Sequence, residues 1–192
     1  MNKQLVIFVK APKFGCVKTR LAKDIGHFKA WRFYKTTVLG LMKRMRSPKW
    51  QITLCITPDD YKGSFFPNDL KPIRQGGGDL GQRMQRVFDD IPKGPVVLIG
   101  GDIPAIEKHH IDKAFNALQN NDITFGPAED GGYWLVGMRR TRARLSPFFD
   151  IRWSTEHALY DTLLNLRANT RHTLTDRLND VDTGKDLKMN KG

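Results

Sequence analysis

The residue types best suited to chemistry stand together near the start of the chain, in the segment Lys10-Ala11-Pro12-Lys13-Phe14-Gly15-Cys16-Val17-Lys18-Thr19-Arg20. Lysine supplies a mobile point charge, arginine a planar fork that matches two phosphate oxygens, and glycine close backbone approach. The segment ends where a short helix should begin, and the free N–H groups of a helix start favour an anion. Neither a P-loop nor a dinucleotide glycine pattern is present. A mobile basic surface loop is one interpretation, but the position directly after an apolar strand favours phosphate binding.

A second chemical candidate is Asp102, which follows Gly100 and Gly101 at the end of the apolar run 96–99. Two glycines before an acid leave its carboxylate with little steric cover at the mouth of a crevice. Carboxylate oxygens suit Mg²⁺ or Mn²⁺, which bind through one or two acids plus substrate phosphates. The alternative role is a helix N-cap, and the two roles do not exclude each other.

Two further acidic segments could complete a site. The first, Glu129-Asp130-Gly131-Gly132, feeds a strand, and its double glycine permits close backbone approach or simply forms a tight turn. The second, Asp180-Val181-Asp182-Thr183-Gly184, could supply a metal ligand or could cap the last helix through Asp182 or Thr183. Spacing along the chain leaves both pairs of alternatives open.

The elements that would position these residues alternate between strand and helix. Apolar, β-branched runs predict strands at 5–9, 51–56, 96–99, 122–125 and 133–138. Apolar residues at helical steps predict helices over 28–45, 80–91 and 111–118, and another after Ser154 as its N-cap. This alternation predicts an α/β fold with an open, largely parallel sheet and helices on both faces. Ligands of such sheets bind beyond the carboxyl ends of the strands, where the candidate residues fall.

Length and composition indicate one soluble domain spanning 1–192. The chain is 40% hydrophobic and carries two cysteines, a pattern typical of a reducing compartment, and it shows no signal peptide or membrane span, so we expect a cytoplasmic protein. Its net charge of +12 is concentrated in residues 1–50, which hold 13 Lys or Arg and one acid, whereas 51–192 are balanced. One face should therefore attract anions, carried either by a small molecule or by a nucleic acid.

Five ordered motifs resemble those of a known family: Pro12-x-x-Gly15-x-Val17-Lys18-Thr19-Arg20-Leu21, Gly101-Asp102-x-Pro104, Pro127-Ala128-x-Asp130-Gly131-Gly132-Tyr133, Trp153-Ser154-Thr155-Glu156-His157 and Asp180-Val181-Asp182-Thr183. The family is the bacterial glycosyltransferase-A-like group of radical-SAM/selenodomain-associated transferases, and the likeness covers about residues 5–187. The chain is more distantly similar to molybdopterin and phospholactate guanylyltransferases. The resemblance implies a Rossmann-like three-layer α/β/α sandwich with a mostly parallel mixed sheet, of the nucleotide-diphospho-sugar transferase type.

The resemblance also implies roles for individual residues. Lys18 and Asp102 would be catalytic, and a divalent Mg²⁺ or Mn²⁺ would lie near Asp102 and Asp182. The donor and acceptor would be bound by Pro12, Gly15, Lys18, Thr19, Arg20, Asp130, Gly131 and Gly132. Two departures stand out. Gly184 occupies a position where relatives often have proline, and Ile103 and Pro104 after Asp102 remove the Asp-x-Asp motif of many sugar transferases. The second departure favours a lone-aspartate site, as in nucleotidyltransferases.

The function predicted from the sequence is a metal-dependent transferase that moves a nucleotidyl or glycosyl group from a nucleoside triphosphate or nucleotide sugar to a small acceptor. One alternative is a nucleic-acid-binding module that uses the basic first quarter. The chain lacks zinc-finger spacing and the aromatic signature of an RNA reader, which makes nucleic acid the less favoured partner. Another alternative is a non-catalytic nucleotide-binding protein on the same fold.

Overall fold

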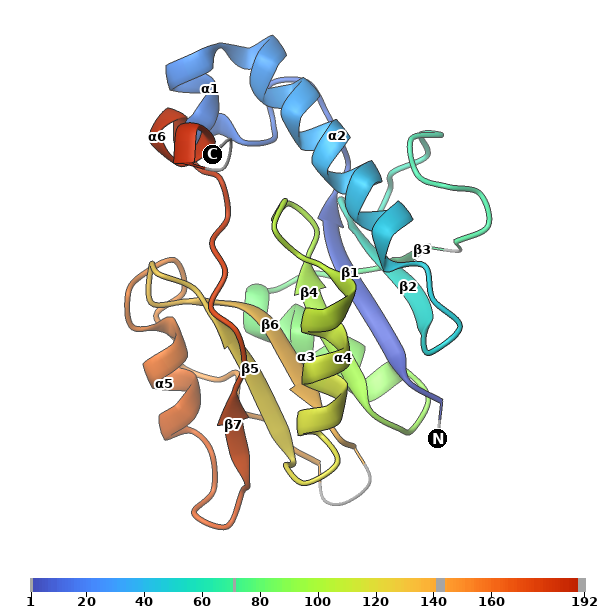
Figure 1. Cartoon of the computed structure of the whole chain (residues 1–192), viewed down its shortest axis with the longest axis vertical. Coiled ribbons are helices and arrows are strands. Elements are labelled where there is room, and N and C mark those ends of the chain that lie inside the picture. Colours follow the sequence, from blue (N-terminus) through green and yellow to red (C-terminus); the bar gives the residue numbers. More distant parts are fainter. Residues whose placement is uncertain (1, 71, 141–143, 190–192) are drawn as a thin grey trace.

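The computed structural model describes residues 2–70, 72–140 and 144–189 and builds them around one seven-stranded sheet. The strand order is β3-β2-β1-β4-β6-β5-β7 (Figure 1). The strands are β1 (Gln4–Lys10), β2 (Gln51–Thr57), β3 (Pro72–Arg74), β4 (Val96–Gly100), β5 (Ile123–Pro127), β6 (Tyr133–Met138) and β7 (His172–Leu174). Only β6 runs antiparallel to its neighbours β4 and β5, so the sheet is mixed and mostly parallel.

Helices cover both faces of the sheet. They are α1 (Thr19–Ile25), α2 (His27–Met45), α3 (Leu80–Asp90), α4 (Lys108–Ala117), α5 (Ala158–Leu164) and α6 (Gly184–Met189). Alternate side chains of β1 enter two separate cores, because successive residues of a strand point to opposite faces. Leu5 and Ile7 pack with α2 and α4, whereas Val6 packs with α3 and, through the same core, α5. The fold is therefore the expected three-layer α/β/α sandwich.

The carboxyl ends of the parallel strands gather the candidate residues at one edge of the sheet. The chain leaves β1 at Lys10, β4 at Gly100 and β5 at Pro127, and it enters antiparallel β6 at Tyr133 on this same edge. The last segment starts from β7 and runs past this edge to α6, which lies beside α1 (Figure 1). Residues from the beginning, middle and end of the chain therefore meet there.

Most predicted elements are confirmed, with boundaries that shift by a few residues. The sequence missed the short edge strands β3 and β7, whose three residues each give no clear periodicity. Ser154 as N-cap is wrong: the helix begins at Ala158 with His157 in the cap position. Ser154 has φ 61°, in the left-handed region, and lies four residues before the helix begins. Within the described residues, no helix is long and apolar enough to span a membrane.

Candidate active site

The candidate site centres on the ammonium group of Lys18, which three carboxylates surround. Lys18 Nζ lies 2.8 Å from Asp102 Oδ2, 2.9 Å from Asp182 Oδ1 and 3.2 Å from Asp180 Oδ2. The lysine side chain is only 4% exposed, while each aspartate is about one-third exposed or more. Lys18 is thus a buried cation at the bottom of an acidic, solvent-open cluster.

The backbone brings Lys18 and Asp102 into contact at the ends of adjacent strands. Lys18 precedes α1 in a left-handed conformation, with φ 45° and ψ 48°, which is unfavourable for a residue with a Cβ atom. Gly101 packs against β1 so closely that a Cβ there would lie 3.0 Å from Phe8 O. Asp102 is not a helix cap, because α4 begins at Lys108 with Glu107 as N-cap. The capping alternative for Asp102 is therefore wrong.

The C-terminal segment supplies the other two carboxylates through a simple alternation. Asp180 and Asp182 flank Val181, which is fully buried against α1 and α2, so the two aspartates point to the opposite side and reach Lys18. Thr183 and Asp186 exchange hydrogen bonds, Thr183 N to Asp186 Oδ2 at 2.7 Å and Asp186 N to Thr183 Oγ1 at 3.3 Å. This reciprocal pattern is a capping box for α6. Thr183 therefore caps the helix while Asp180 and Asp182 serve the site.

Burial and charge oppose one another in this cluster. Burial alone would lower the pKa of Lys18, but Asp102 and Asp180 raise it above its ordinary value, so the group stays cationic. Burial and the neighbouring carboxylates raise the pKa of Asp180 to about 6, against the attraction of Lys18. For Asp182, burial alone would raise the pKa, but the charge and hydrogen bond of Lys18, a hydrogen bond with Asp180 and the charge of Arg20 together lower it. Three carboxylates face two cations, Lys18 and the exposed Arg20, whose Nη1 lies 3.3 Å from Asp182 Oδ2. The cluster thus has capacity for further positive charge.

A cavity of about 290 Å³ opens beside the cluster and brings in the predicted acceptor residues. Asp102 and Asp180 share its wall with Asp130 and Gly132. Asp130 Oδ1 accepts a hydrogen bond of 2.9 Å from Gly132 N, which shapes the turn before β6. Most of the remaining lining is apolar or aromatic, including Leu80, Met84, Tyr133 and Trp153, and Ser154 and Thr155 add two hydroxyl groups. The volume is at the lower end of the ~300–1,000 Å³ typical of small-molecule sites.

Gly131 fixes this turn against the motif that contains Trp153. Gly131 has φ +81°, and its carbonyl accepts a hydrogen bond of 3.0 Å from Leu159 N in α5. A Cβ at this position would lie 2.5 Å from Glu156 Cα. Only glycine therefore allows the turn and the segment 153–157 to pack together.

The remaining predicted residues lie in the loop before Lys18 or in the first turn of α1. Gly15, with φ +75°, and Thr19 are exposed, and Gly15 has no neighbour that a Cβ would touch. Pro12 O accepts a hydrogen bond of 2.7 Å from Trp31 Nε1, which ties the loop to α2. At the start of the loop, Tyr34 Oη donates to Lys10 O at 2.8 Å and accepts from Lys10 N at 2.9 Å. These loop residues do not line the cavity beside Asp102.

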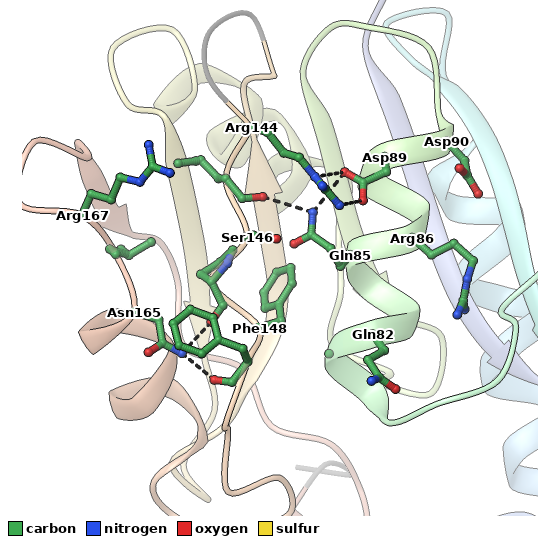
Figure 2. A pocket seen from close by; sticks show the side chains of 15 residues that line it. Gln82, Gln85, Arg86, Asp89, Asp90, Arg144, Ser146, Phe148, Asn165 and Arg167 are labelled. Carbon is green, nitrogen blue, oxygen red and sulfur yellow. Dashed lines mark hydrogen bonds and ion pairs between the residues drawn. The ribbon is translucent and has the colours of Figure 1, made fainter.

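A larger cavity of about 770 Å³ lies elsewhere, between α3 and the segments 144–149 and 165–167 (Figure 2). Two of its charged residues pair with each other, Arg144 with Asp89, and Gln85 Nε2 also donates to Asp89 Oδ1 at 3.1 Å. None of the residues predicted for the site lines it. We therefore place the chemistry at the smaller cavity.

A divalent metal fits the donor set of the Lys18 cluster. Among the described residues, no three His, Cys, Asp or Glu side chains stand ready to hold a metal ion as they are. In the structure the Lys18 ammonium lies 2.8–3.2 Å from one oxygen of each of three carboxylates. Carboxylate oxygens are the ligands that Mg²⁺ and Mn²⁺ prefer. Asp102, Asp180 and Asp182 are the residues that would hold the ion.

The sequence did not assign three residues that the structure places at the site. In the segment 180–184 only Asp182 is predicted as a metal ligand, although the Asp-Val-Asp alternation in an extended chain puts Asp180 and Asp182 on one side. Tyr133 and Trp153 lie in recognised motifs, and only the tertiary structure shows that both line the cavity. Hydrophobic side chains in a motif carry no sequence signal that separates core from pocket.

Comparison with known proteins identifies a family and relatives of the same fold. The model of a family described as "Uncharacterized protein conserved in bacteria", DUF2064, matches residues 41–155. A crystal structure of a protein from Desulfovibrio desulfuricans G20, proposed to be a nucleotide-diphospho-sugar transferase, is 33% identical with a TM-score of 0.90. The match covers 98% of this chain and 86% of that protein. The predicted fold type is confirmed.

More distant relatives have assigned activities or ligands. The 2-phospho-L-lactate guanylyltransferase of Methanocaldococcus vulcanius is 24% identical over 138 residues, which are 70% of this chain and 61% of that enzyme. The chain thus spans about six-tenths of the length of this relative. The manganese complex of Rv0371c from Mycobacterium tuberculosis H37Rv has a TM-score of 0.52 at 15% identity, covering 98% and 97% of the two chains, and shows the fold alone. The predicted likeness to phospholactate guanylyltransferases is confirmed, and the association with radical-SAM proteins stays a prediction.

Proposed function

The chain belongs to the DUF2064 family, and we propose that it is a metal-dependent nucleotidyltransferase that joins a nucleoside monophosphate unit from a nucleoside triphosphate to a small acidic or phosphorylated acceptor. The observation that carries the proposal is the convergence of Lys18, Asp102, Asp180 and Asp182 beside a ligand-sized cavity. The family relationship to guanylyltransferases supports the reaction class.

In the proposed complex, donor phosphates lie against the loop 12–18 and the first residues of α1. Arg20, with a side chain 72% exposed, can turn its guanidinium toward two phosphate oxygens, and Lys18 adds a point charge. Gly15 lets the loop backbone approach without a side chain in the way. A divalent ion held by the aspartates would neutralise charge on the transferring phosphoryl group. Catalysis then rests on positioning and charge stabilisation.

The acceptor in this proposal occupies the cavity lined by Asp130, Gly132, Tyr133 and Trp153. The aromatic walls exclude water and pack on the acceptor body, and the backbone N–H groups of the glycine turn offer donors for an acidic group. Nucleotidyl transfer is preferred to glycosyl transfer because Asp102 stands alone at its strand end, without an Asp-x-Asp motif.

Product analysis tests this choice directly. The protein is incubated with Mn²⁺, an acceptor and either GTP, other nucleoside triphosphates or nucleotide sugars. Nucleotidyl transfer releases pyrophosphate, glycosyl transfer releases a nucleoside diphosphate, and 2-phospho-L-lactate is the first acceptor to try. Pyrophosphate release that depends on acceptor supports the proposal. Nucleoside diphosphate release from a sugar donor would support the glycosyltransferase alternative. Nucleotide binding with no turnover would support a non-catalytic role.

The nucleic-acid alternative needs a continuous, free basic surface, and several of the basic residues in 1–50 are already engaged. Arg44 donates to Pro104 O at 2.8 Å, Lys49 pairs with Asp112 at 2.7 Å, and Lys18 is buried. Lys35 lies over the ring of Trp31 at 4.3 Å. Oligonucleotide titration at several salt concentrations separates the two ideas, because each phosphate contact contributes a slope of about 0.9 to the salt dependence on duplex DNA.

A further inference from the structure

We infer that the Lys18 ammonium is an internal stand-in for the divalent ion: it holds the three aspartates together until metal and donor bind, and it must leave for the metal to enter. The inference rests on the proposed function and concerns how that site is loaded. Three carboxylate oxygens lie 2.8–3.2 Å from one nitrogen, and this is also the only point where all three acids face a common partner among the described residues.

Two cations cannot share this point. A metal ion held by Asp102, Asp180 and Asp182 would compete with the Lys18 ammonium for the same carboxylate oxygens, and like charges in a partly buried setting repel strongly. A lysine is suited to giving up its place to a metal ion, because its ammonium group is carried by a flexible four-carbon side chain. An arginine fork would bind two oxygens in a fixed plane and would leave less readily.

The placement also explains why the lysine is held in a strained backbone. Lys18 lies in the left-handed region at φ 45°, between an exposed loop and α1. In the present state three ion pairs compensate for that strain. Donor phosphates above the loop would offer the ammonium another anionic partner, and its departure would free the aspartates for metal. Metal and donor should therefore bind with positive coupling, in both directions.

The test measures the affinity for Mn²⁺ alone. The inference predicts that removing Lys18 raises this affinity, whereas removing an ordinary residue of a binding site lowers it. Lys18→Met keeps the apolar stem and removes the charge, so its affinity for Mn²⁺ should rise at least about tenfold over wild type, or about 1.4 kcal/mol. The matched control is Arg20→Met, which removes a charge from the same cluster without vacating its centre, and its affinity should change by less than about threefold. Titration calorimetry or the paramagnetic resonance of free Mn²⁺ measures each dissociation constant. Unchanged or weaker Mn²⁺ binding by Lys18→Met overturns the inference, as does an equal gain in both variants.

A second measurement needs no variant and covers the case in which Lys18→Met does not fold. An amine-acetylating reagent is applied to the wild-type protein with and without Mn²⁺, and modified lysines are located by mass spectrometry. Lys18 should react slowly without metal and several-fold faster with it, whereas the exposed Lys29 should react equally in both. An unchanged Lys18 rate at saturating Mn²⁺ overturns the exchange. Neither measurement involves a nucleotide. Each can therefore succeed or fail independently of the test of the proposed nucleotidyl transfer.

Discussion

Replacing Gly131 by alanine should destabilise the protein more than the same change at Gly15 or Gly132. Comparison of the three variants separates the effect of a positive φ from that of steric obstruction. Gly131 combines a positive φ of +81° with a backbone obstruction, since a Cβ would lie 2.5 Å from Glu156 Cα and closer still to the Glu156 carbonyl oxygen. Gly15 has a positive φ of +75° and open space. Gly132 has neither a positive φ nor a rigid obstruction: its nearest neighbour would be Asp130 Oδ1, the end of a movable side chain, at 3.1 Å.

The expected magnitudes follow from these three environments. A left-handed backbone costs a residue with Cβ about 1–2 kcal/mol, and overpacking adds about 1–3 kcal/mol. Gly131→Ala should therefore lose about 2–5 kcal/mol of unfolding free energy and Gly15→Ala about 1–2 kcal/mol, because only the backbone term applies there. Gly132→Ala should stay within about 1 kcal/mol of wild type.

Thermal and urea unfolding of the four proteins measure this series. For a domain of this size, each kcal/mol shifts the melting temperature by about 2–4 °C, so the Gly131 and Gly132 variants should be clearly resolved. If Gly131→Ala proved as stable as Gly132→Ala, the turn would not pack against Glu156, and the cavity wall built from it would be wrong. If Gly15→Ala lost as much as Gly131→Ala, the loss would come from backbone conformation alone.

Three further predictions concern the site and the core. A metal–nucleotide pair at 100 times its dissociation constant should stabilise the protein by about 2.7 kcal/mol, and Asp102→Asn should remove most of this stabilisation. The apo variant should still fold, because Lys18 keeps two carboxylate partners. Metal-dependent stabilisation of Asp102→Asn in a thermal-shift series would contradict the metal role. Arg20→Ala should weaken nucleotide binding in calorimetry while changing stability by less than about 0.5 kcal/mol, since its side chain is 72% exposed, and unchanged affinity would remove Arg20 from the site. Cys16 is exposed, whereas Cys55 is fully buried, and burial raises the pKa of its thiol to about 12. A disulfide reagent at neutral pH should therefore modify Cys16 rapidly and Cys55 only on unfolding. Rapid modification of both thiols would contradict the placement of Cys55 in β2.

The alternation of strand and helix could be read from the sequence because the long elements carry their own periodicity. The apolar run at 5–9 and the amphipathic pattern over 28–45 each encode burial locally, and both elements form within a residue or two of prediction. The short strands β3 and β7 escaped prediction, because three residues at the sheet edge are held by pairing with a neighbour rather than by their own pattern. The prediction of Ser154 as N-cap failed because its backbone is left-handed, a conformation that the residue type does not indicate, and α5 begins only at Ala158.

The sequence by itself indicated which residues have side chains suited to ligand binding or catalysis. It also indicated at which edge of the sheet they lie, since strand ends and glycine turns are local features. The sequence and the family resemblance predicted phosphate binding for Lys18 and metal binding for Asp102 and Asp182 as separate roles. Only the tertiary structure brings the three into one ion-pair cluster and adds Asp180, because 162 residues separate Lys18 from Asp180 and no local rule couples their positions. The contact depends on how α6 docks beside α1 through the buried Val181, a long-range packing event that no periodicity in the chain encodes.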